Sequence, residues 1–399
     1  MTATEVSPSA VTGVEAGAEA FRAEFRAWLD DAFTTDVAEA VADRQDPATL
    51  PARRAWNAAL VDAGYGAISW PVEHGGRGAG ILEQLAWYEE MDRARAPGPV
   101  NVIGVSNIAP AIMSHGTPAQ QQRFLAPMLR GDEIWSQGMS EPDAGSDLAS
   151  LRCAAVLDGD HYVVSGQKTW NSLGDQAAWC QLYVRTDPTV PKHQGITCLL
   201  VDLASPGIEV RPIRTMGGEL GFAELFFQDV RVPVDAVLGQ VGDGWAVATR
   251  TLGNERAGVA GLYLSLRATF DRVVSAAAVP TADGRRPIDD PVKRDALAAR
   301  FTEARLLEFL AKRMLGSMLT GGFPAAEGSI VKTAWAQWSQ AMAVTAVDVL
   351  GLPALSGDWA DALCGSRSLT IAGGTTEVNR NIVGERVLGL PREPAPEPS

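Results

Sequence analysis

The sequence predicts an α+β multidomain protein in which a central β-domain lies between two α-helical domains. Apolar residues recur with the 3.6-residue period of a helix from about Glu15 to Arg130, with a period near 2 from about Trp135 to Gln240, and with the helical period again from about Gly244 to Gly389. A chain of 399 residues has room for two or three domains. The strand-like segments follow one another without intervening helices, which argues against a Rossmann-type parallel sheet.

Residues 1–134 are expected to form the N-terminal α-helical domain. Two segments place apolar residues on one helical face, as expected for helices that pack on a core. The first stripe consists of Phe21, Phe25 and Leu29. The second lies within Ile81–Met91 and consists of Leu82, Leu85 and either Trp87 or Tyr88.

A further helix is predicted to begin after Thr117. Thr117 suits the N-cap, Pro118 suits the first helical position, and Gln120 suits the reciprocal bond of a capping box. The glycine-rich segment Trp70–Gly80 lacks the G-x-G-x-x-G spacing of a phosphate-binding loop and is not framed by a strand and a helix. We expect it to be a structural loop.

Residues 135–240 are expected to form the central β-domain, a β-barrel or sandwich. Its strands are predicted at Tyr162–Lys168, Gln181–Val184, Ile196–Val201 and Ala223–Phe227. The intervening turns are predicted at Asp158-Gly159, Pro206-Gly207 and Met216–Gly218.

Residues 241–390 are expected to form a C-terminal α-helical domain that resembles a four-helix bundle. Its helices are predicted at Trp245–Val274, Val292–Leu319, Ser329–Leu350 and Thr376–Leu388. The last helix follows Gly373-Gly374, two glycines that permit a tight turn before a helix N-terminus. Residues 391–399 are rich in Pro and Glu and are predicted to be a disordered tail.

Composition narrows the function classes. The net charge of −14 argues against nucleic-acid binding, because neutralising phosphates requires clustered Lys and Arg. The four cysteines include no CxxC pair and the four histidines lie far apart, so neither a disulfide framework nor a metal site is predicted. No apolar run reaches the roughly 18 residues of a transmembrane helix, and the first residues lack the basic start of a signal peptide. We therefore expect a cytoplasmic enzyme with no membrane partner.

Four segments of the chain resemble sequence blocks of the acyl-CoA dehydrogenase family. They are Trp135–Asp147 (WSQGMSEPDAGSD), Gly166–Ser172 (GQKTWNS), Phe227–Pro233 together with Gly242–Trp245, and Gly373–Arg380 (GGTTEVNR). The blocks occur in the order found in that family, and the resemblance extends from about residue 15 to residue 392. It implies the same α–β–α order of domains that the periodicity predicts.

The resemblance implies FAD as the cofactor. A flavin ring requires hydrogen bonds to its N5, O4 and pyrimidine edge, and an apolar wall that excludes water. The implied cofactor-binding residues are Gln137, Met139, Ser140, Ser146, Trp170, Ser172, Thr375 and Glu377. In this set Trp170 would pack against the isoalloxazine ring and Ser172 would donate near N5 or O4. Glu377 also has a simpler explanation, since acidic residues stabilise the first turn of a helix.

The substrate contacts and the catalytic base are implied in the same way. Ser146, Arg256 and Gly374 are the implied substrate-binding residues, with an acyl-CoA as the substrate. In most relatives the base is a carboxylate directly before the Gly-Thr of the C-terminal block, where this chain has Gly373. The sequence therefore resembles more closely the isovaleryl-CoA and long-chain acyl-CoA dehydrogenases, whose base lies on the helix that opens the last domain. Glu255 is the implied catalytic base, and Arg256 would orient the substrate region or form an ion pair.

Two features of the family are missing. Relatives have an Arg-x-x-Phe-Gly stretch where this chain has Pro280–Gly284, and a Gln-x-x-Gly-Gly-x-Gly loop where it has Asp348–Ala354. In the family both stretches contact FAD, the first from a neighbouring subunit, and Arg285 or Arg286 are the possible substitutes for the lost arginine. Similar departures occur in members that form mixed tetramers. We therefore expect a homo-oligomer or a hetero-oligomer with a second family subunit, most simply a tetramer.

Taken together, the resemblance implies an FAD-dependent acyl-CoA dehydrogenase. Such an enzyme would convert an acyl-CoA thioester into trans-2-enoyl-CoA and pass the electrons to an electron-transfer flavoprotein or a similar acceptor. One alternative is a weakly catalytic partner subunit that completes a heteromeric enzyme. Another is a flavin monooxygenase or oxidase on the same fold, although that chemistry has no need of a base such as Glu255. The length and branching of the acyl group, and its carrier, CoA or acyl carrier protein, stay open.

Overall fold

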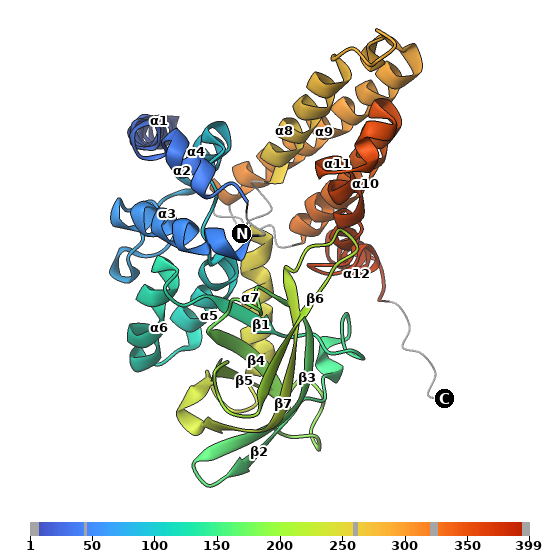
Figure 1. Cartoon of the computed structure of the whole chain (residues 1–399). Helices are drawn as coiled ribbons and strands as arrows, with labels where there is room; N and C mark the ends of the chain where they lie inside the picture. Colours follow the sequence, from blue (N-terminus) through green and yellow to red (C-terminus); the bar gives the residue numbers. More distant parts are fainter. Residues whose placement is uncertain (1–7, 44–45, 258–261, 320–325, 393–399) are drawn as a thin grey trace. The chain divides into compact units, whose positions relative to one another are not determined.

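The computed structural model describes residues 8–43, 46–257, 262–319 and 326–392, with the side chains of residues 8–14 and 252–262 outside this description. The chain divides into two compact units, one formed by Pro8–Glu255 and the other carried by Arg256–Ser399. The element order along the chain is helical, then β, then helical, as predicted (Figure 1). Residues 393–399 of the predicted tail lie outside the described residues.

Helices form the N-terminal region. They are α1 (Pro8–Ala32), α2 (Thr35–Ala40), α3 (Leu50–Asp62), α4 (Ile81–Ala94), α5 (Ala109–His115) and α6 (Pro118–Arg130). The predicted stripe on α1 is confirmed, because Phe21, Phe25 and Leu29 are all buried in one core with residues of α3 and α4. This core is rich in stacked and tilted aromatic rings.

The predicted inward face of α4 is only partly correct. Trp87 is buried and Tyr88 is exposed, which decides between the two aromatic candidates. Leu82 and Leu85 are only half-buried, so their prediction as core residues is wrong. The buried face is instead centred on Ala86, Trp87, Glu90 and Met91. The helical period of α4 was predicted correctly. The buried face is rotated from the predicted one because a charged residue, Glu90, belongs to it.

Two predicted local structures are confirmed. The Thr117 hydroxyl accepts a hydrogen bond from the Gln120 N–H at 3.2 Å, and the Gln120 side chain accepts one from the Thr117 N–H at 3.0 Å, which completes the capping box. In the loop Trp70–Gly80 the Trp70 indole donates to the Val105 carbonyl at 3.1 Å. A Cβ at Gly76 would lie 2.1 Å from the Trp70 carbonyl, so the glycine is needed for this close backbone approach. The loop is therefore a built structural element.

The strands form one eight-stranded sheet in the order β6-β7-β3-β2-β4-β5-β8, with β1 paired to β4. Pairing is antiparallel except for β1 with β4 and β2 with β4, which agrees with the expected absence of a Rossmann sheet. The four predicted strands lie within β3, β4, β5 and β7. The strands are β1 (Trp135–Gly138), β2 (Ala154–Asp158), β3 (His161–Ser172), β4 (Trp179–Arg185), β5 (Ile196–Asp202), β6 (Ile208–Ile213), β7 (Phe222–Pro233) and β8 (Val237–Leu238).

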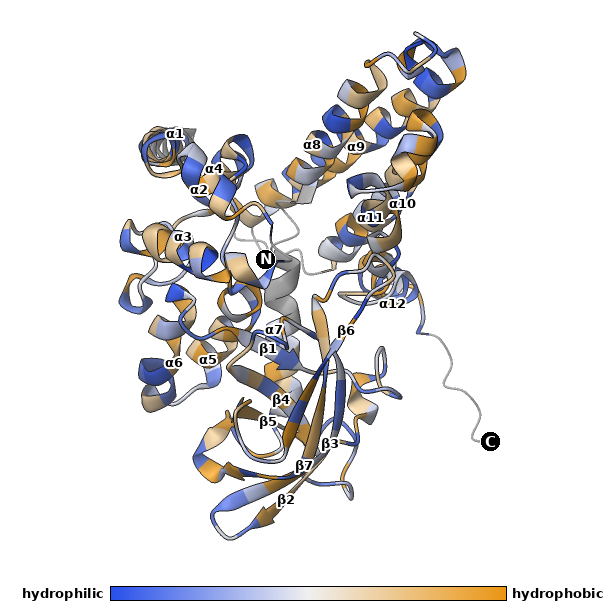
Figure 2. Cartoon of the chain, in the orientation of Figure 1, coloured by the Kyte–Doolittle hydropathy of each residue, from blue (hydrophilic) through white to orange (hydrophobic). Residues whose placement is uncertain are grey.

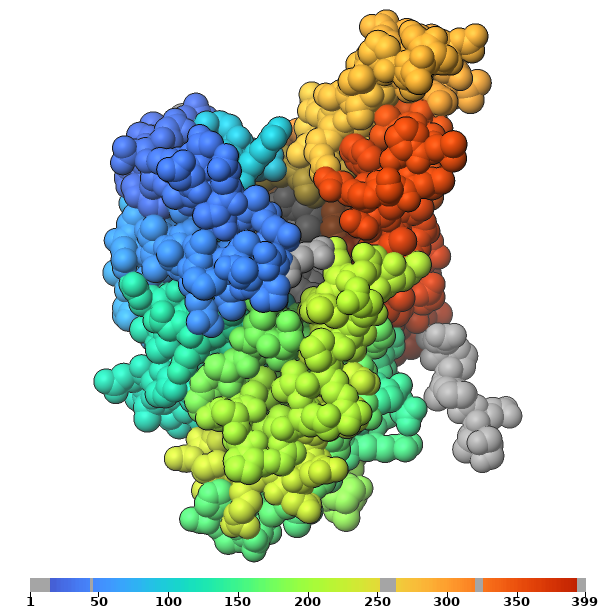
Figure 3. Space-filling model, in the orientation of Figure 1, coloured from blue at the N-terminus to red at the C-terminus, as the bar shows by residue number. Residues whose placement is uncertain are grey.

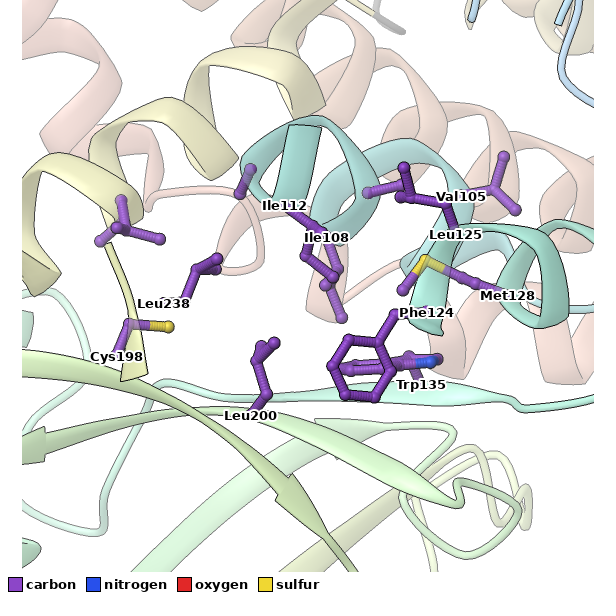
Figure 4. Close-up of a cluster of buried hydrophobic side chains, with 14 of the residues drawn as sticks. Val105, Ile108, Ile112, Phe124, Leu125, Met128, Trp135, Cys198, Leu200 and Leu238 are labelled. Atoms are coloured by element: carbon purple, nitrogen blue, oxygen red, sulfur yellow. The ribbon is translucent and has the colours of Figure 1, made fainter. Parts of the chain in front are cut away.

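Both faces of this sheet carry a buried core. On one face Trp135 and Leu200 pack with Ile108, Ile112 and Phe124 from the helical region (Figure 4). The other core is built from strands and loops, and no α-helix of the described chain contributes to it. Because its residues are nonetheless fully buried, the sheet must cover this face itself, as the predicted barrel or sandwich requires. In the space-filling view the helices and the sheet of this unit form one continuous body (Figure 3).

Helices return after the sheet. They are α7 (Gly244–Ala257), α8 (Leu262–Ala277), α9 (Pro291–Leu319), α10 (Glu327–Leu350), α11 (Asp358–Gly365) and α12 (Thr376–Ile382). The predicted helix Trp245–Val274 corresponds to α7 and α8, with residues 258–261 between them outside the description. The predicted helix Thr376–Leu388 changes after Ile382 into a π-helical turn, Val383–Val387. Hydrophobic residues follow much of α9 and α10 (Figure 2).

In the described residues, none of the helices combines the length and the hydrophobicity that crossing a bilayer demands.

Candidate active site

The segment Trp135–Asp147 begins as strand β1 and then turns away from the sheet. Gln137 lies in β1, and Met139 and Ser140 follow directly after it as half-buried residues. A tight turn comes next, closed by reciprocal backbone bonds of 3.0 and 3.1 Å between Glu141 and Ala144. Ser146 is exposed beyond this turn. Three of the implied flavin contacts are thus adjacent, while Ser146 stands apart from them.

A buried ion pair connects this segment to strand β3. Lys168 is fully buried, and its ammonium donates to the Glu141 carboxylate at 2.9 Å and to the Met139 carbonyl at 3.0 Å. The carboxylate also accepts from the backbone N–H groups of Arg152 and Cys153, at 2.6 and 2.8 Å. Buried charges are tolerated when they are paired and fully hydrogen-bonded in this way. Both residues lie inside the segments that resemble the family, but their pairing could not be predicted because they are 27 residues apart.

Trp170 has an unusual backbone conformation and an unusual exposure. Its φ is 60°, in the left-handed region that bulky residues rarely adopt. Its side chain is 58% exposed and touches the edge of Phe222, with ring centroids 6.0 Å apart. The pairing register of β3 with β7 shifts between Lys168 and Asn171, so Trp170 lies in an irregularity of the strand. Such irregularities re-aim side chains, and this one turns an indole ring outward.

Hydrogen bonds hold the residues on both sides of Trp170. Together they fix β1 and its continuation to β3, which is what a rigid binding surface requires. They join the Thr169 N–H to the Ser140 carbonyl (2.9 Å), the Asn171 side-chain amide to the Gln137 carbonyl (2.7 Å), and the Ser136 hydroxyl to the Ser172 carbonyl (2.8 Å).

The C-terminal block begins with two glycines in left-handed conformations. Gly373 has a φ of 66° and Gly374 a φ of 87°. Thr375 then caps α12, its hydroxyl accepting from the Val378 N–H at 3.2 Å. Glu377 is exposed in the first turn of this helix, which suits the simpler explanation of its charge.

A buried lysine of α10 fixes this glycine turn. The Lys332 ammonium donates to the Gly374 carbonyl at 2.6 Å, and the Asn379 side-chain amide donates to the same carbonyl at 2.8 Å. Lys332 and Asn379 are both buried. The sequence analysis missed Lys332 because its partner is 42 residues away and no motif contained it.

The implied base lies on α7. The helix extends to Ala257 and therefore includes Glu255 and Arg256, whose side chains fall outside the described residues. One turn earlier, the buried Thr251 hydroxyl lies 3.3 Å from the Tyr183 hydroxyl. Burial raises the pKa of Tyr183 well above its usual range, so this phenol stays protonated.

The implied residues fall into two groups, each assembled within its own unit. One group lies on β1, on the residues directly after it and on β3, in the unit Pro8–Glu255, and consists of Gln137, Met139, Ser140, Trp170 and Ser172. The other group, in the unit carried by Arg256–Ser399, consists of Gly374, Thr375 and Glu377.

The residues of the first group fit a flavin ring. The exposed indole of Trp170 offers a flat apolar face. Ser140, after β1, and Ser172, at the end of β3, are half-buried residues with hydroxyl donors. A planar ring with polar edges is bound by such a combination of an aromatic wall and convergent hydrogen-bonding groups.

Known proteins match most of the length of the chain. Three models of acyl-CoA dehydrogenase domains match it in order: the N-terminal domain at residues 16–132, the middle domain at 136–230 and the C-terminal domain at 242–388. The acyl-CoA dehydrogenase IpdE1 of Mycolicibacterium smegmatis is 39% identical over 392 residues, covering 94% of this chain and 98% of that protein. The chain belongs to the acyl-CoA dehydrogenase family. This confirms the resemblance and places the protein in a family of oxidoreductases.

Solved structures of acyl-CoA dehydrogenases have the same fold. A chain of the ChsE4–ChsE5 complex from Mycobacterium tuberculosis is 32% identical, with a TM-score of 0.81 and coverage of 98% of this chain and all of that one. A chain of the Tcur3481–Tcur3483 steroid ACAD is 28% identical, also with a TM-score of 0.81, over 98% of this chain and all of that one.

Proposed function

We propose that the protein is an FAD-dependent dehydrogenase that converts an acyl-CoA thioester into trans-2-enoyl-CoA. The observation that supports this most is the surface around Trp170, an outward-facing indole held by hydrogen bonds beside Met139, Ser140 and Ser172. A costly left-handed conformation at an exposed aromatic residue is expected where it serves a ligand.

In this proposal the chain's residues bind, orient and deprotonate the substrate. Bound FAD would supply the acceptor for a β-hydride. Trp170 would cover one side of the ring, with Gln137, Met139 and Ser140 along its edge. From the family resemblance, Ser146, Arg256 and Gly374 are the residues that would bind the acyl-CoA. Within its own unit, the turn at Gly374 is fixed by Lys332 and Asn379.

Glu255 is the proposed base for the α-proton. It lies four residues beyond Thr251 on α7, one helical turn from a contact that is buried against the sheet. Gly373 has no side chain that could accept a proton, so the carboxylate that most relatives have at this position is absent from this chain. A carboxylate on α7 is the replacement that the family resemblance indicates.

The test is anaerobic flavin reduction by acyl-CoAs with the variant Glu255→Gln. Removing the proton acceptor should slow reduction by at least about 100-fold while FAD content and acyl-CoA binding change little. Glu209→Gln, on an exposed position of β6, is the matched control and should reduce normally. Near-normal reduction in Glu255→Gln would contradict the assignment of the base.

A second proposal concerns assembly. Residues Pro280–Gly284 form a surface turn without the family's arginine, and of the two possible substitutes Arg286 is committed to Asp289 at 2.8 Å. Arg285 is left as the exposed candidate. Both similar solved structures, ChsE4–ChsE5 and Tcur3481–Tcur3483, are named after two components. We therefore propose a hetero-oligomer in which a second family subunit completes the FAD site, with an electron-transfer flavoprotein or a similar protein as electron acceptor.

A further inference from the structure

Three amide side chains form a row on the face of the sheet that meets the helices. Gln137 of β1 and Gln181 of β4 are paired in register, and the Gln137 amide donates to the Gln181 side-chain oxygen at 3.5 Å. Asn107, in the π-helical turn Gly104–Ile108, donates to the Gln137 side-chain oxygen at 3.4 Å. Gln181 is fully buried and Asn107 is 8% exposed. Trp135 and Tyr183, two residues from Gln137 and Gln181 along the same strands, belong to the buried hydrophobic core of this face.

The hydrogen bonds of this amide row are incomplete. Both inter-amide distances are at the long end of the range for hydrogen bonds. The Gln181 Nε2 and the nearby Trp135 Nε1 are buried donors that find no partner in the part of the chain that the structure describes. Burying an unsatisfied donor costs free energy, and a row that served only packing would be replaced by apolar residues without that cost. Both unsatisfied groups are placed as donors, so the partner they lack is a hydrogen-bond acceptor.

In the proposed function the row lies between the strand that borders the flavin and the helix that carries the base. Gln137 belongs to the strand proposed to border the flavin, and its carbonyl is fixed by Asn171, next to Trp170. Two residues beyond Gln181 on the same face of β4, Tyr183 contacts Thr251 of α7. Glu255 follows one turn later on that helix. A substrate held between the flavin strand and the proposed base is therefore adjacent to the amides.

We propose that Asn107, Gln137 and Gln181 select acyl groups that carry an oxygen acceptor, a ketone in the simplest case, with Gln181 as the principal donor. This inference rests on the proposed dehydrogenase function. It predicts a specificity for oxo-acyl thioesters over the corresponding plain acyl thioesters. A bound water could also satisfy the donors, and it would give no such preference.

The test compares matched acyl-CoAs that differ only by a ketone: octanoyl-CoA with its 5-, 6- and 7-oxo derivatives, and 3-cyclohexylpropanoyl-CoA with its 4-oxocyclohexyl derivative. For each pair, kcat/KM for flavin reduction and the calorimetric Kd of the enoyl-CoA product are measured. The enzyme should prefer at least one oxo compound by about tenfold in both quantities. Gln181→Leu, a shape-similar change, should reduce the ratio to near one and leave the plain compound unchanged or improved.

Two further variants keep the outcome interpretable. Gln167→Leu on β3, whose amide bonds Glu224 at 2.9 Å outside the row, is the control and should keep the preference. If Gln181→Leu fails to fold, Asn107→Leu replaces it, and it too should reduce the preference for the oxo compound. A preference that is absent in the wild type, or that survives in both row variants, would overturn the inference while leaving the dehydrogenase intact. Failure of every acyl-CoA to reduce the flavin would instead contradict the proposed function, and with it this inference.

Discussion

Trp170 is the residue whose conformation most clearly departs from what packing alone would produce. Its side chain is exposed and its backbone has a left-handed conformation. The hydrogen bonds of the neighbouring residues, and not the burial of its own ring, hold it in place. Its contribution to the free energy of unfolding should therefore be small. Its contribution to a ligand that stacks on it should be large.

We expect Trp170→Ala to weaken FAD binding by about tenfold or more, since the variant loses an aromatic stacking surface. The melting temperature of the apoprotein should change little, because no buried cavity is created. Trp170→Phe keeps an aromatic ring and should retain most of the affinity. Titration of the apoprotein with FAD, followed by flavin fluorescence, measures the effect. Unchanged FAD binding in Trp170→Ala would show that the indole does not contact the cofactor.

Gly373 carries a conformational requirement in addition to its missing carboxylate. At a φ of 66° any other L-residue is strained, so Gly373→Ala should lower the free energy of unfolding by about 1 kcal/mol. Gly316→Ala, in the last turn of α9 with open space around its Cβ position, should raise it by about 0.5 kcal/mol. Urea unfolding of the two variants provides the comparison. Equal effects of the two substitutions would contradict the argument.

The backbone strain at position 373 also limits how well a carboxylate placed there can replace Glu255. The double variant Glu255→Gly with Gly373→Glu should recover only a small part of the lost flavin reduction, because the new side chain begins from a left-handed residue.

Among the elements, α1 and α4 are joined by a charge cluster as well as by aromatic packing. The Glu90 carboxylate is 1% exposed and accepts bonds from Arg26 at 2.6 and 2.8 Å, from Arg93 at 2.7 Å and from Arg22 at 3.4 Å. Hydrogen bonds from Arg26, with those from Arg93, lower the pKa of Glu90 to about 2. The carboxylate at this position therefore contributes to the packing of α1 against α4.

We expect Glu90→Gln to destabilise the N-terminal helices by about 2 kcal/mol at pH 7, a figure reduced because the arginines are partly exposed. The folded-state pKa lies below the unfolded value, so the stabilisation is complete above about pH 4.5 and is lost as the pH falls toward 2. The difference in the free energy of unfolding between Glu90→Gln and the wild type should therefore become smaller as the pH falls. Tryptophan fluorescence in urea, at pH 7 and pH 3, measures it, with Glu39→Gln on α2 as control. A difference that does not depend on pH would contradict the mechanism.

The elements that the sequence predicted are those with a long, regular period. Strands β3, β5 and β7 and helices α9 and α10 belong to this group. Several of the missed elements are short or irregular: β1 has four residues, β6 contains Pro212 and has no fully buried residue, and α11 has eight residues. The phase error on α4 arose because a buried Glu90 cannot be distinguished from a solvent-facing one until its arginines are known.

The site divides in the same way between local and long-range information. The segments around Ser140 and Trp170 could be found because a continuous motif carries each of them. The contacts that hold these segments could not be predicted, because the partners are far apart in sequence. Glu141 and Lys168 are separated by 27 residues, and Gln137 and Gln181 by 44. Nothing local in the sequence distinguishes these polar residues from surface ones.

At the scale of the whole molecule, the unit carried by Arg256–Ser399 exposes several large apolar side chains. They include Leu306, Phe309, Leu352, Leu355 and Ile371, which are 62%, 57%, 83%, 58% and 65% exposed. Phe309 lies on α9 and Leu352 in the short helix that follows α10. Association with another subunit would bury such residues. The family's FAD contact across subunits is also altered here, which favours a second kind of chain as the partner.

The prediction at this scale concerns FAD occupancy and subunit number together. Purified alone, the chain should hold FAD at well below one per subunit, because Pro280–Gly284 lacks the arginine that relatives contribute to a neighbouring FAD. Produced together with a second family subunit, it should form a tetramer with a higher FAD content, as measured by light scattering and flavin absorbance. Phe309→Glu should weaken assembly, because it places a charge in the proposed interface. Val156→Glu on β2, at a site 67% exposed in the other unit, should not. A stable monomer with full FAD occupancy would contradict the proposal, since neither the exposed apolar residues nor the altered FAD contact would then require a partner.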